Sequence, residues 1–371
     1  MLLLERERKG LKLPLLRKVT AEAAVVAVED LHMGLSVADI LHELEMDDET
    51  LAAAVIHIAR IPIAAEYTAT NFNETVAAML DDLGKIGAVA EVRSEEAREG
   101  LEEHTENLRR MLLTIADDVR VVVIILAERM HQLRMLKSAD PELQRSIALE
   151  TREIHAPLAN RLGIWRVKWE LEDLTLRYLE PDEYKRIAGS LKSRRAEREA
   201  YVDAVIELLR DKCNEAGIVA EIAGRPKHIF SIWRKMQRKR VDIDQIFDLL
   251  AVRILVDTVA ECYTVLGFVH GLWRYIPGEF DDYIATPKAN LYRSLHTAVI
   301  GPEEKPVEIQ IRTPEMHEHA ERGVAAHWAY KENRGHDTEF QRRLLWMRHW
   351  LELKEEVADS DFVERFKSEF E

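Results

Sequence analysis

The chain has 371 residues, 47% hydrophobic and 32% charged, which is typical of a folded protein with enough length for two or three cores. Its formal net charge of −15 argues against general binding to nucleic acids. It has no apolar run long enough for a membrane span or a signal-peptide core, and Cys213 and Cys262 provide no disulfide framework, so we expect a cytoplasmic protein.

Most of the chain before residue 216 has the period of α-helices. Apolar residues at helical spacing predict a helical bundle in the N-terminal part: Leu108, Met111, Leu112, Ile115, Val122, Ile125, Leu126, Met130 and Leu133. Pro181 is expected to open a further helix. We expect a helical domain at 1–162, a helical connector at 163–215, a mixed domain at 216–334 and a helical segment at 335–371.

A helix with one basic face is predicted after Gly224. A strand-like run at 218–222 precedes this glycine, and the helix has an apolar stripe that we expect to dock on a sheet: Ile229, Ile232, Trp233 and Met236. The other face carries cations and a hydroxyl: Lys227, Ser231, Arg234, Lys235 and Arg238. Because 225–240 holds seven Arg or Lys and no acid, phosphate is the expected ligand. A solvated basic face on a core helix is the alternative.

Two carboxylates stand where predicted strands can present them. Asp248 directly precedes an apolar strand-like run, a position from which it can reach Mg²⁺ or simply cap the strand entry. The run 307–312 alternates strictly, so its apolar residues pack inward while Glu308, Gln310 and Arg312 share the polar face. Such a face is either the wall of a site or the solvated side of an antiparallel sheet.

The loop 287–297, which leads into a strand expected from Thr297, combines cations, an amide and an aromatic ring. A purine can stack on Tyr292, Lys288 can meet phosphate oxygens, and Asn290 or His296 can read polar edges or ribose. Together with the basic helix and the two carboxylates, these side chains are typical of a nucleotide-transferring site.

Residues of roughly 215–332 resemble the synthetase domain of the RelA/SpoT alarmone synthetases. Five motifs, in this order, carry the resemblance: Gly224 to Met236, Phe247-Asp248 followed by Ala251-Val252-Arg253, Asn290 to Thr297, Val307 to Thr313, and Ala325 to Lys331. It implies an α+β fold, in which an all-helical degenerate HD-type domain precedes a mixed-sheet nucleotidyltransferase-like domain. The implied activity, in the stringent response, moves the pyrophosphate of ATP onto the 3′-hydroxyl of GDP or GTP.

The resemblance also implies roles for single residues. Asp248 would hold Mg²⁺, and Glu308 would assist the metal or accept the proton of the 3′-hydroxyl. The ATP side would be lined by Arg225, Lys227, Ser231, Lys235 and Arg253. Tyr292 would stack on the guanine, beside Lys288, Asn290, His296 and Gln310. Because strict alternation puts Asp248 and Arg253 on opposite faces, a bulge intervenes or Arg253 acts from elsewhere.

An acidic loop is expected at Glu279-Phe280-Asp281-Asp282, after Pro277-Gly278. Bifunctional members of the family carry Arg-x-Lys-Asp there, whereas synthetase-only members of the RelA type carry the acidic form. The resemblance therefore implies a synthetase-only member with a different response to divalent metals. It also implies a preference for GDP over GTP, on which the rest of the sequence says nothing. An acidic surface turn is the ordinary alternative.

Residues of about 20–175 resemble the HD-type, Mn²⁺-dependent ppGpp hydrolase domain of bifunctional relatives but lack its ligands. Ile58 follows His57 where the family has aspartate, and Ile61-Pro62 replace an acidic pair. Met33, next to His32, stands at an earlier histidine position, and Glu128 and Gln132 replace Asp and Asn. These losses imply an inactive hydrolase. A reorganised metal site using His57 and His131 is the alternative.

The resemblance limits the partners. ATP and GDP or GTP are the expected ligands, and no membrane is involved. Full-length relatives continue into a regulatory half that engages the ribosome and tRNA, so we expect a catalytic fragment or a short member that lacks those contacts. Two other readings stay open: a bifunctional enzyme with residual ppGpp hydrolase activity, and an RNA- or ribosome-binding module using the helix at 225–240.

Overall fold

The computed structural model of the chain describes residues 14–22, 27–63, 65–96, 118–193, 195–225, 227–243, 250–288, 290 and 292–323. By its internal contacts the chain separates into two compact units, one with the described residues up to 127 and one with those from 128 onward. Asp248, the apolar residues at 108–115 and the segments 325–331 and 335–371 lie outside the described residues. The domain boundaries expected at 162, 215 and 334 stay predictions.

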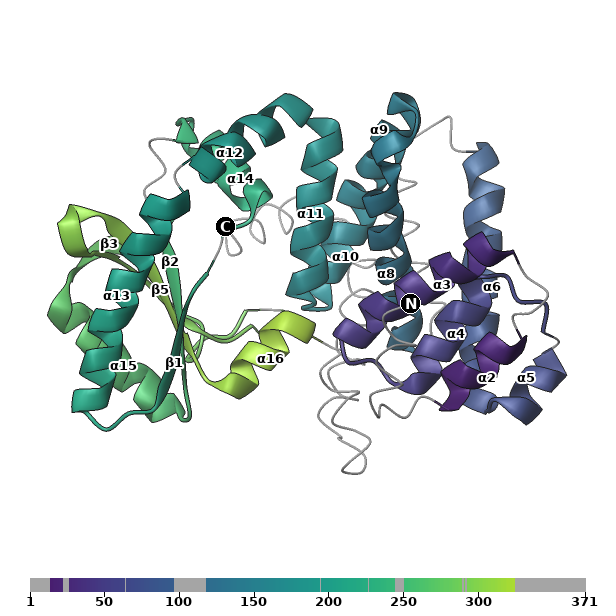
Figure 1. Ribbon diagram of the computed structural model, residues 1–371, viewed down its shortest axis with the longest axis horizontal. Coiled ribbons are helices and arrows are strands. Elements are labelled where there is room, and N and C mark those ends of the chain that lie inside the picture. The colour runs from purple at the N-terminus through teal and green to yellow at the C-terminus, as the bar shows by residue number, and fades with distance from the viewer. Residues whose placement is uncertain are drawn as a thin grey trace, which may run out of the picture. The chain divides into compact units, whose positions relative to one another are not determined.

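The first unit is helical throughout its described part. Its elements are α2 (Pro14–Glu22), α3 (Val28–Glu43), α4 (Asp48–Ile58), α5 (Ala65–Asn71), α6 (Glu74–Glu96) and the first part of α8 (Val119–Met135) (Figure 1). Helix α4 packs against α2, α3 and α6, and its residues 50–58 are buried except for His57. At Gly34 of α3, a Cβ would lie 3.3 Å from the backbone of Val55, so the two helices approach closely. The predicted helical bundle is confirmed for these residues.

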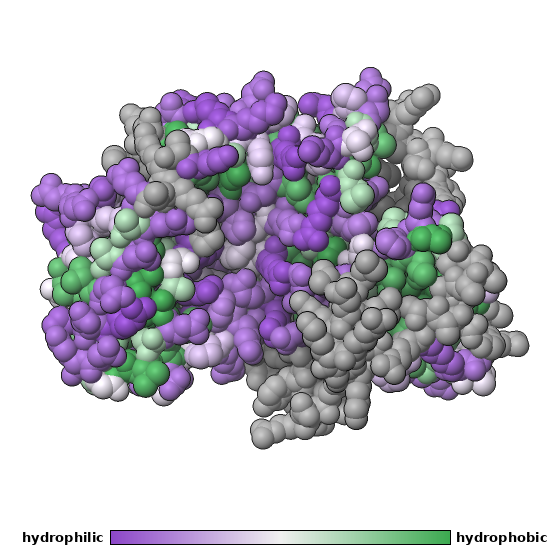
Figure 2. All heavy atoms as spheres, in the orientation of Figure 1, coloured by the Kyte–Doolittle hydropathy of each residue, from purple (hydrophilic) through white to green (hydrophobic). Residues whose placement is uncertain are grey.

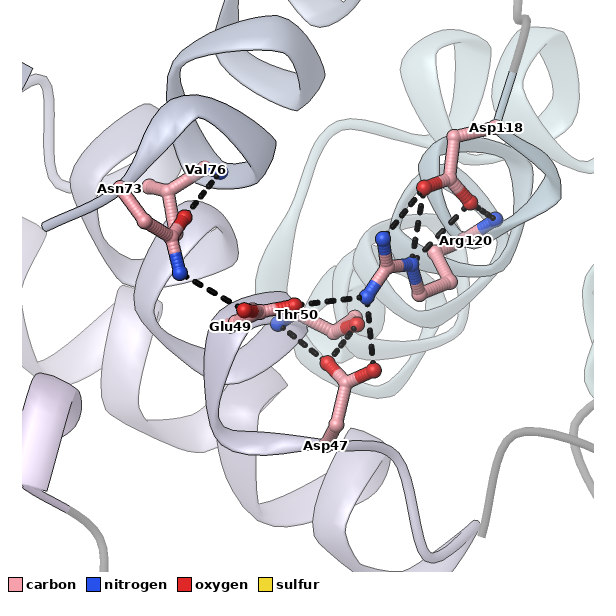
Figure 3. A network of polar contacts seen from close by, with 7 residues as sticks. All are labelled: Asp47, Glu49, Thr50, Asn73, Val76, Asp118 and Arg120. Carbon is pink, nitrogen blue, oxygen red and sulfur yellow. Dashed lines mark hydrogen bonds and ion pairs between the residues drawn. The ribbon is translucent and has the colours of Figure 1, made fainter. Parts of the chain in front are cut away.

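A buried arginine ties the start of α4 to the start of α8 (Figure 3). The Nη1 atom of Arg120 lies 2.7 Å from Oδ2 of Asp47 and 3.1 Å from Oε2 of Glu49, and its Nη2 atom lies 2.5 Å from Oδ2 of Asp118. Glu49 also accepts a hydrogen bond of 2.7 Å from the amide of Asn73. The Arg120 side chain is 6% exposed, so this network supplies the charges that make its burial tolerable.

The second unit opens with further helices. They are the rest of α8, the 3-10 turn η2 (Leu136–Ser138), α9 (Pro141–Glu150), the π-helical turn η3 (Thr151–His155), α10 (Ala156–Arg161), α11 (Trp165–Leu179), α12 (Pro181–Ser193) and α13 (Arg195–Glu215). The connector predicted at 163–215 is therefore helical. Pro181 opens α12 as expected, because the first turn of a helix does not use the N–H that proline lacks.

A mixed five-stranded sheet follows in the order β1-β2-β5-β4-β3. The strands are β1 (Ala220–Gly224), β2 (Ala251–Val256), β3 (Arg274–Asp282), β4 (Leu295–Ile300) and β5 (Pro306–Arg312). Only β2 and β5, among these described strands, run parallel to each other, and the other neighbours are antiparallel. The predicted α+β class, with a helical part before a mixed sheet, is confirmed. Strands β1 and β4 begin two residues after and two residues before the expected positions, respectively.

One face of the sheet is the core of the second unit. Val307, Ile309 and Ile311 are fully buried there, as the alternation of β5 predicts, together with the apolar residues of β2. Helices α13 and α15 (Val259–Leu272) pack over this face (Figure 1). Helix α15 starts with a capping box between Thr258 and Glu261, which satisfies backbone donors at its first turn. The turn η6 (Pro302–Glu304) and helix α16 (Pro314–Arg322) flank β5.

The basic helix α14 (Ile229–Lys239) packs against other helices, so the expectation that its apolar stripe docks on the sheet is wrong. Ile232 and Met236 join Ile187 of α12 and Ile243 in a small core separate from that of the sheet. A stripe of apolar residues shows that one face must be covered, but it does not say which element covers it. Here α12 supplies that surface.

The acidic segment 279–282 is part of edge strand β3, so the expected loop is wrong. Its pairing with β4 shifts register between Tyr275 and Phe280, and Pro277 and Gly278 lie within this irregular stretch. An edge strand tolerates proline and glycine there because one side of it needs no backbone partner. The turn-forming pair at 277–278 therefore distorts the strand instead of ending it.

The surface visible in Figure 2 is mostly hydrophilic, consistent with 32% charged residues. Among the helices that the structure describes, none combines the length and the apolar character that a membrane crossing needs.

Candidate active site

The second face of the sheet carries polar residues in register across its strands. Gln310 of β5 is paired with Arg253 of β2 on one side and with His296 of β4 on the other. His296 is in turn paired with Asp281 of β3. Because paired residues on adjacent strands point to the same face, these side chains form one row, and Glu308 lies on the same face two residues before Gln310.

Glu308 is the centre of this row. Its Oε2 atom lies 3.1 Å from Nζ of Lys227, and its Oε1 atom accepts a hydrogen bond of 2.6 Å from the amide of Gln310. Burial opposes the charged form, but the ammonium of Lys227, with smaller contributions from His296 and Gln310, lowers the pKa of Glu308 to about 2. The carboxylate is therefore ionised at neutral pH.

Tyr292, in the segment before β4, and His296 of β4 extend the row. The hydroxyl of Tyr292 lies 2.9 Å from Nε2 of His296, whose Nδ1 lies 3.8 Å from Oε1 of Glu308. Burial lowers the pKa of His296 to about 4 and raises the pKa of Tyr292, so both groups are neutral. The carboxylate of Glu308 favours a proton on Nδ1, which leaves Nε2 to accept from the tyrosine hydroxyl.

The ring of Tyr292 is packed on several sides. It is 8% exposed, and its edge or face meets Trp165, Tyr283 and His296 at centroid distances of 5.5, 6.1 and 5.6 Å. A guanine base would therefore stack on it only where one of these neighbours moves aside. Guanine stacking on Tyr292 stays a prediction.

Lys288 and Asn290 hold the segment before β4 in place. The ammonium of Lys288 lies 4.3 Å from the ring centre of Tyr283, and burial lowers the pKa of this lysine. The amide of Asn290 donates to the carbonyl of Asn160 at 3.2 Å and accepts from the backbone N–H of Tyr292 at 3.3 Å. Asn290 thus anchors the loop to the end of α10.

A second buried arginine lies behind the row. Arg312 is 1% exposed, and its Nη2 atom lies 2.7 Å from Nδ1 of His317 and 3.4 Å from Oε1 of Glu321, both on α16. The same carboxylate lies 3.9 Å from Nη1 of Arg253. Glu321 therefore offsets two guanidinium groups at once. The sequence analysis missed Glu321 and His317. Their only signal in the sequence is that they follow Arg312 within nine residues.

Helix α11 contributes an aromatic wall that sequence reasoning assigned only to the connector. The guanidinium of Arg225 lies 4.8 Å from the ring centre of Trp169, whose ring is stacked with His228 at 4.8 Å. Trp165, one turn earlier, meets Tyr292. The two tryptophans lie four residues apart, as on one face of a helix, but nothing in the sequence identifies the loops that this face meets.

The structure thus gathers most of the predicted site residues. Lys227, Glu308, Gln310, His296 and Tyr292 are joined by contacts, and Arg253 is in register beside Gln310. Ser231 and Lys235 lie four residues apart, on the same face of α14. The relation of Asp248 to Arg253 and to Glu308 stays a prediction, because Asp248 lies outside the described residues.

Magnesium suits part of this donor set. An ionised carboxylate is a ligand that Mg²⁺ prefers, so Glu308 fits such a site as one oxygen donor. Within the described ranges, no group of three or more His, Cys, Asp or Glu side chains is placed to hold a metal ion.

The positions of the expected hydrolase ligands are occupied differently. Ile58 and Ile61 are buried apolar residues, while His57 is half-buried near the end of α4. In the second unit, burial lowers the pKa of His131. The inactive hydrolase, and the alternative of a metal site that uses His57 and His131, both stay predictions.

Comparisons with known proteins find similar sequences in two parts of the chain. A family model described as "Region found in RelA / SpoT proteins" matches residues 224–335, and an HD-domain model matches residues 21–165. A GTP pyrophosphokinase of Escherichia coli (strain K12) is 46% identical over 333 residues, which are 88% of this chain and 45% of that protein. The chain spans less than half the length of the curated relatives that it matches.

Two further similar proteins are a relative named as a hydrolase and a protein with a solved structure. A probable guanosine-3′,5′-bis(diphosphate) 3′-pyrophosphohydrolase of Synechocystis sp. is 41% identical over 341 residues, which are 90% of this chain and 44% of that protein. The crystal structure of small alarmone synthetase 2 from Bacillus subtilis matches with a TM-score of 0.31 and 25% identity, covering 45% of this chain and 98% of that chain.

Proposed function

Because the chain belongs to the RelA/SpoT family, we propose that it transfers the pyrophosphate group of ATP to the 3′-hydroxyl of GDP or GTP, yielding ppGpp or pppGpp and AMP. The carrying observation is the ionised carboxylate of Glu308, held 3.1 Å from the ammonium of Lys227 on a polar sheet face. A phosphoryl transfer needs positioning and charge neutralisation above all, and this pair supplies groups for both.

The low pKa of Glu308 favours one of its two expected roles. A general base works best when its pKa lies near the working pH, so a carboxylate with a pKa of about 2 is a weak proton acceptor. It is, however, ionised at neutral pH and can therefore bind a cation. Glu308 therefore acts first as a ligand for Mg²⁺, and it becomes a better proton acceptor only when Lys227 turns toward a phosphate.

Mg²⁺, when bound, would neutralise the phosphate oxygens of ATP and make its β-phosphorus easier to attack. Asp248 and Glu308 are the residues proposed to hold it. The proposed ATP side consists of Arg225, Lys227, Ser231, Lys235 and Arg253. The proposed guanine-nucleotide side consists of Lys288, Asn290, Tyr292, His296 and Gln310.

The N-terminal unit is proposed to be a hydrolase domain that no longer works. A relative named GTP pyrophosphokinase and one named a probable pyrophosphohydrolase match at similar identity, 46% and 41%, so identity does not separate the two activities. The support comes from the residues: Ile58, Ile61 and Pro62 offer no oxygen or nitrogen ligand in their side chains. The acidic segment 279–282 supports a preference for GDP over GTP. The composition of the chain supports a cytoplasmic location.

The proposed synthesis is tested by incubating the purified chain with Mg²⁺, ATP and GDP and separating the nucleotides by anion exchange. Glu308→Ala and Asp248→Ala should each lower the rate more than roughly a hundredfold, the low end for an electrostatic or proton-transfer role. Glu303→Ala is the matched control, because Glu303 is 67% exposed and pairs with Lys305. Near-normal ppGpp formation by Glu308→Ala would remove that residue from the site.

A further inference from the structure

Helix α11 presents three residues on one side to the two loops of the candidate site. Trp165, Trp169 and Asp173 are spaced by four residues, so they lie along one face of the helix. Trp165 meets Tyr292, in the segment before β4, at 5.5 Å between ring centres. Trp169 and Asp173 meet the segment 225–230, which joins β1 to α14.

Asp173 fixes the far end of that segment. Its Oδ1 accepts a hydrogen bond of 2.8 Å from the backbone N–H of Phe230, and its Oδ2 lies 3.1 Å from Nδ1 of His228. The imidazole of His228 is stacked on Trp169 with an interplanar angle of 23°. The path of the chain into α14 is therefore set by α11.

Arg225 occupies the near end of the segment. Its backbone N–H donates to the carbonyl of Ala251 at 2.8 Å, which anchors the main chain to β2. Its guanidinium lies 4.8 Å from the ring centre of Trp169. Among the residues that the structure describes, no carboxylate forms a close ion pair with this guanidinium, and its charge meets that of Glu308 only at longer range.

An aromatic partner has a different consequence from a carboxylate. A carboxylate would occupy the N–H donors of the arginine and cancel its charge, whereas a ring face holds the guanidinium plane and leaves its N–H groups at the edge for another ligand. An arginine held in this way is preorganised to meet a nucleotide, either at its phosphates or over its base.

We propose that Trp169 is a positioning residue for the donor nucleotide: it holds the guanidinium of Arg225 in the orientation that binds ATP. This inference rests on the proposed function, which assigns Arg225 to the ATP side. Trp169 lies outside residues 224–335, so the donor site extends beyond the matched synthetase region into α11.

The test compares Trp169→Leu with Trp169→Phe by steady-state kinetics with ATP and GDP varied separately. Trp169→Leu should raise KM for ATP about three- to thirtyfold, the range of a cation–π contact, with little change in KM for GDP. Trp169→Phe keeps a ring face and should restore most of the affinity. Glu170→Gln is the control on the same helix, because Glu170 pairs with Arg134 and not with the site. Trp169→Met replaces Trp169→Leu if the latter does not fold.

A double-mutant cycle separates positioning from general support of the fold. If Trp169 acts through Arg225, then Trp169→Leu should have no further effect on KM for ATP in an Arg225→Ala background. Full additivity of the two substitutions, an unchanged KM for ATP, or equal rises for ATP and GDP would each overturn the inference.

Calorimetric binding of a non-hydrolysable ATP analogue distinguishes this inference from the proposed function. If the chain makes no ppGpp but binds the analogue, and Trp169→Leu weakens that binding, the proposed function fails and the inference stands. If the chain makes ppGpp while both proteins bind the analogue equally, the inference alone fails. Absence of both activity and analogue binding overturns both.

Discussion

Replacing Lys227 by methionine should raise the pKa of Glu308 and move the acid limb of catalysis to higher pH. The substitution removes the ammonium 3.1 Å from the carboxylate while keeping an unbranched side chain of similar length. Burial then opposes the charged form of Glu308 without its strongest counterion. If the ionised carboxylate is required, activity at low pH is lost earlier in the variant.

The magnitude follows from Coulomb's law. Two unit charges 3.1 Å apart attract by about 1 kcal/mol in water and by about 5 kcal/mol at an effective dielectric constant of about 20. The side chains of Lys227 and Glu308 are 14% and 17% exposed, so the true value lies between these limits. At 1.36 kcal/mol for each tenfold change, the pKa of Glu308 should rise from about 2 to between about 3 and 6.

The same pair links stability to pH with a defined sign. The pKa of Glu308 in the folded chain, about 2, lies below its unfolded value of roughly 4.3. Its stabilising contribution is therefore fully present above about pH 4.3 and is lost as the pH falls toward 2. Lys227→Met should reduce this contribution while the folded pKa stays below about 4.3, and should reverse its sign if the pKa rises above that value.

The assay is a pH profile of kcat from pH 5 to 8 at saturating ATP and GDP, because Lys227 is also assigned to ATP binding. Lys212→Met is the matched control, since Lys212 pairs with Glu215 on an exposed turn of α13 and should leave the profile unchanged. A carbon-13 NMR titration of the Glu308 carboxyl group reads its pKa directly. Coincident titrations of wild type and Lys227→Met would refute the reasoning.

The remaining predictions concern Tyr292, the degradation of ppGpp and Arg120. Tyr292→Phe should cost about 1 kcal/mol of stability in urea unfolding, because it removes the 2.9 Å contact with His296, and Tyr292→Ala should raise the requirement for GDP more than that for ATP. A rise in the ATP constant instead would contradict the division of the site. The chain should not degrade labelled ppGpp with Mn²⁺ when a bifunctional relative does, and turnover that disappears in His57→Ala would show that a metal site persists. Arg120→Met should destabilise the helical unit by about 3–5 kcal/mol in denaturant unfolding, since it leaves Asp47, Glu49 and Asp118 without their cation. The control Arg186→Met, at an exposed ion pair, should cost less than about 1 kcal/mol in the same measurement. Equal losses in the two variants would exclude the buried network as the cause.

Local patterns in the sequence were sufficient for several features. The alternation at 307–312 identified the inward residues of β5 and the polar face with Glu308 and Gln310, because side chains of a strand point alternately to its two sides. Helical periodicity predicted the helices at 163–215, and Pro181 marked the start of α12. These patterns depend on neighbours within a few residues, so they can be read without knowing the rest of the fold.

Partners distant in the sequence were decided only by the tertiary structure. The apolar stripe of α14 was predicted, but its packing on α12 was not. The pair 277–278 suggested a turn, whereas pairing with β4 keeps these residues within the edge strand β3. Likewise, the segment 163–215 was predicted to be helical, whereas the contact of its Trp169 with Arg225 joins residues 56 positions apart. An amphipathic pattern states that a face must be buried, and the choice of partner depends on the shape and pairing of all competing surfaces.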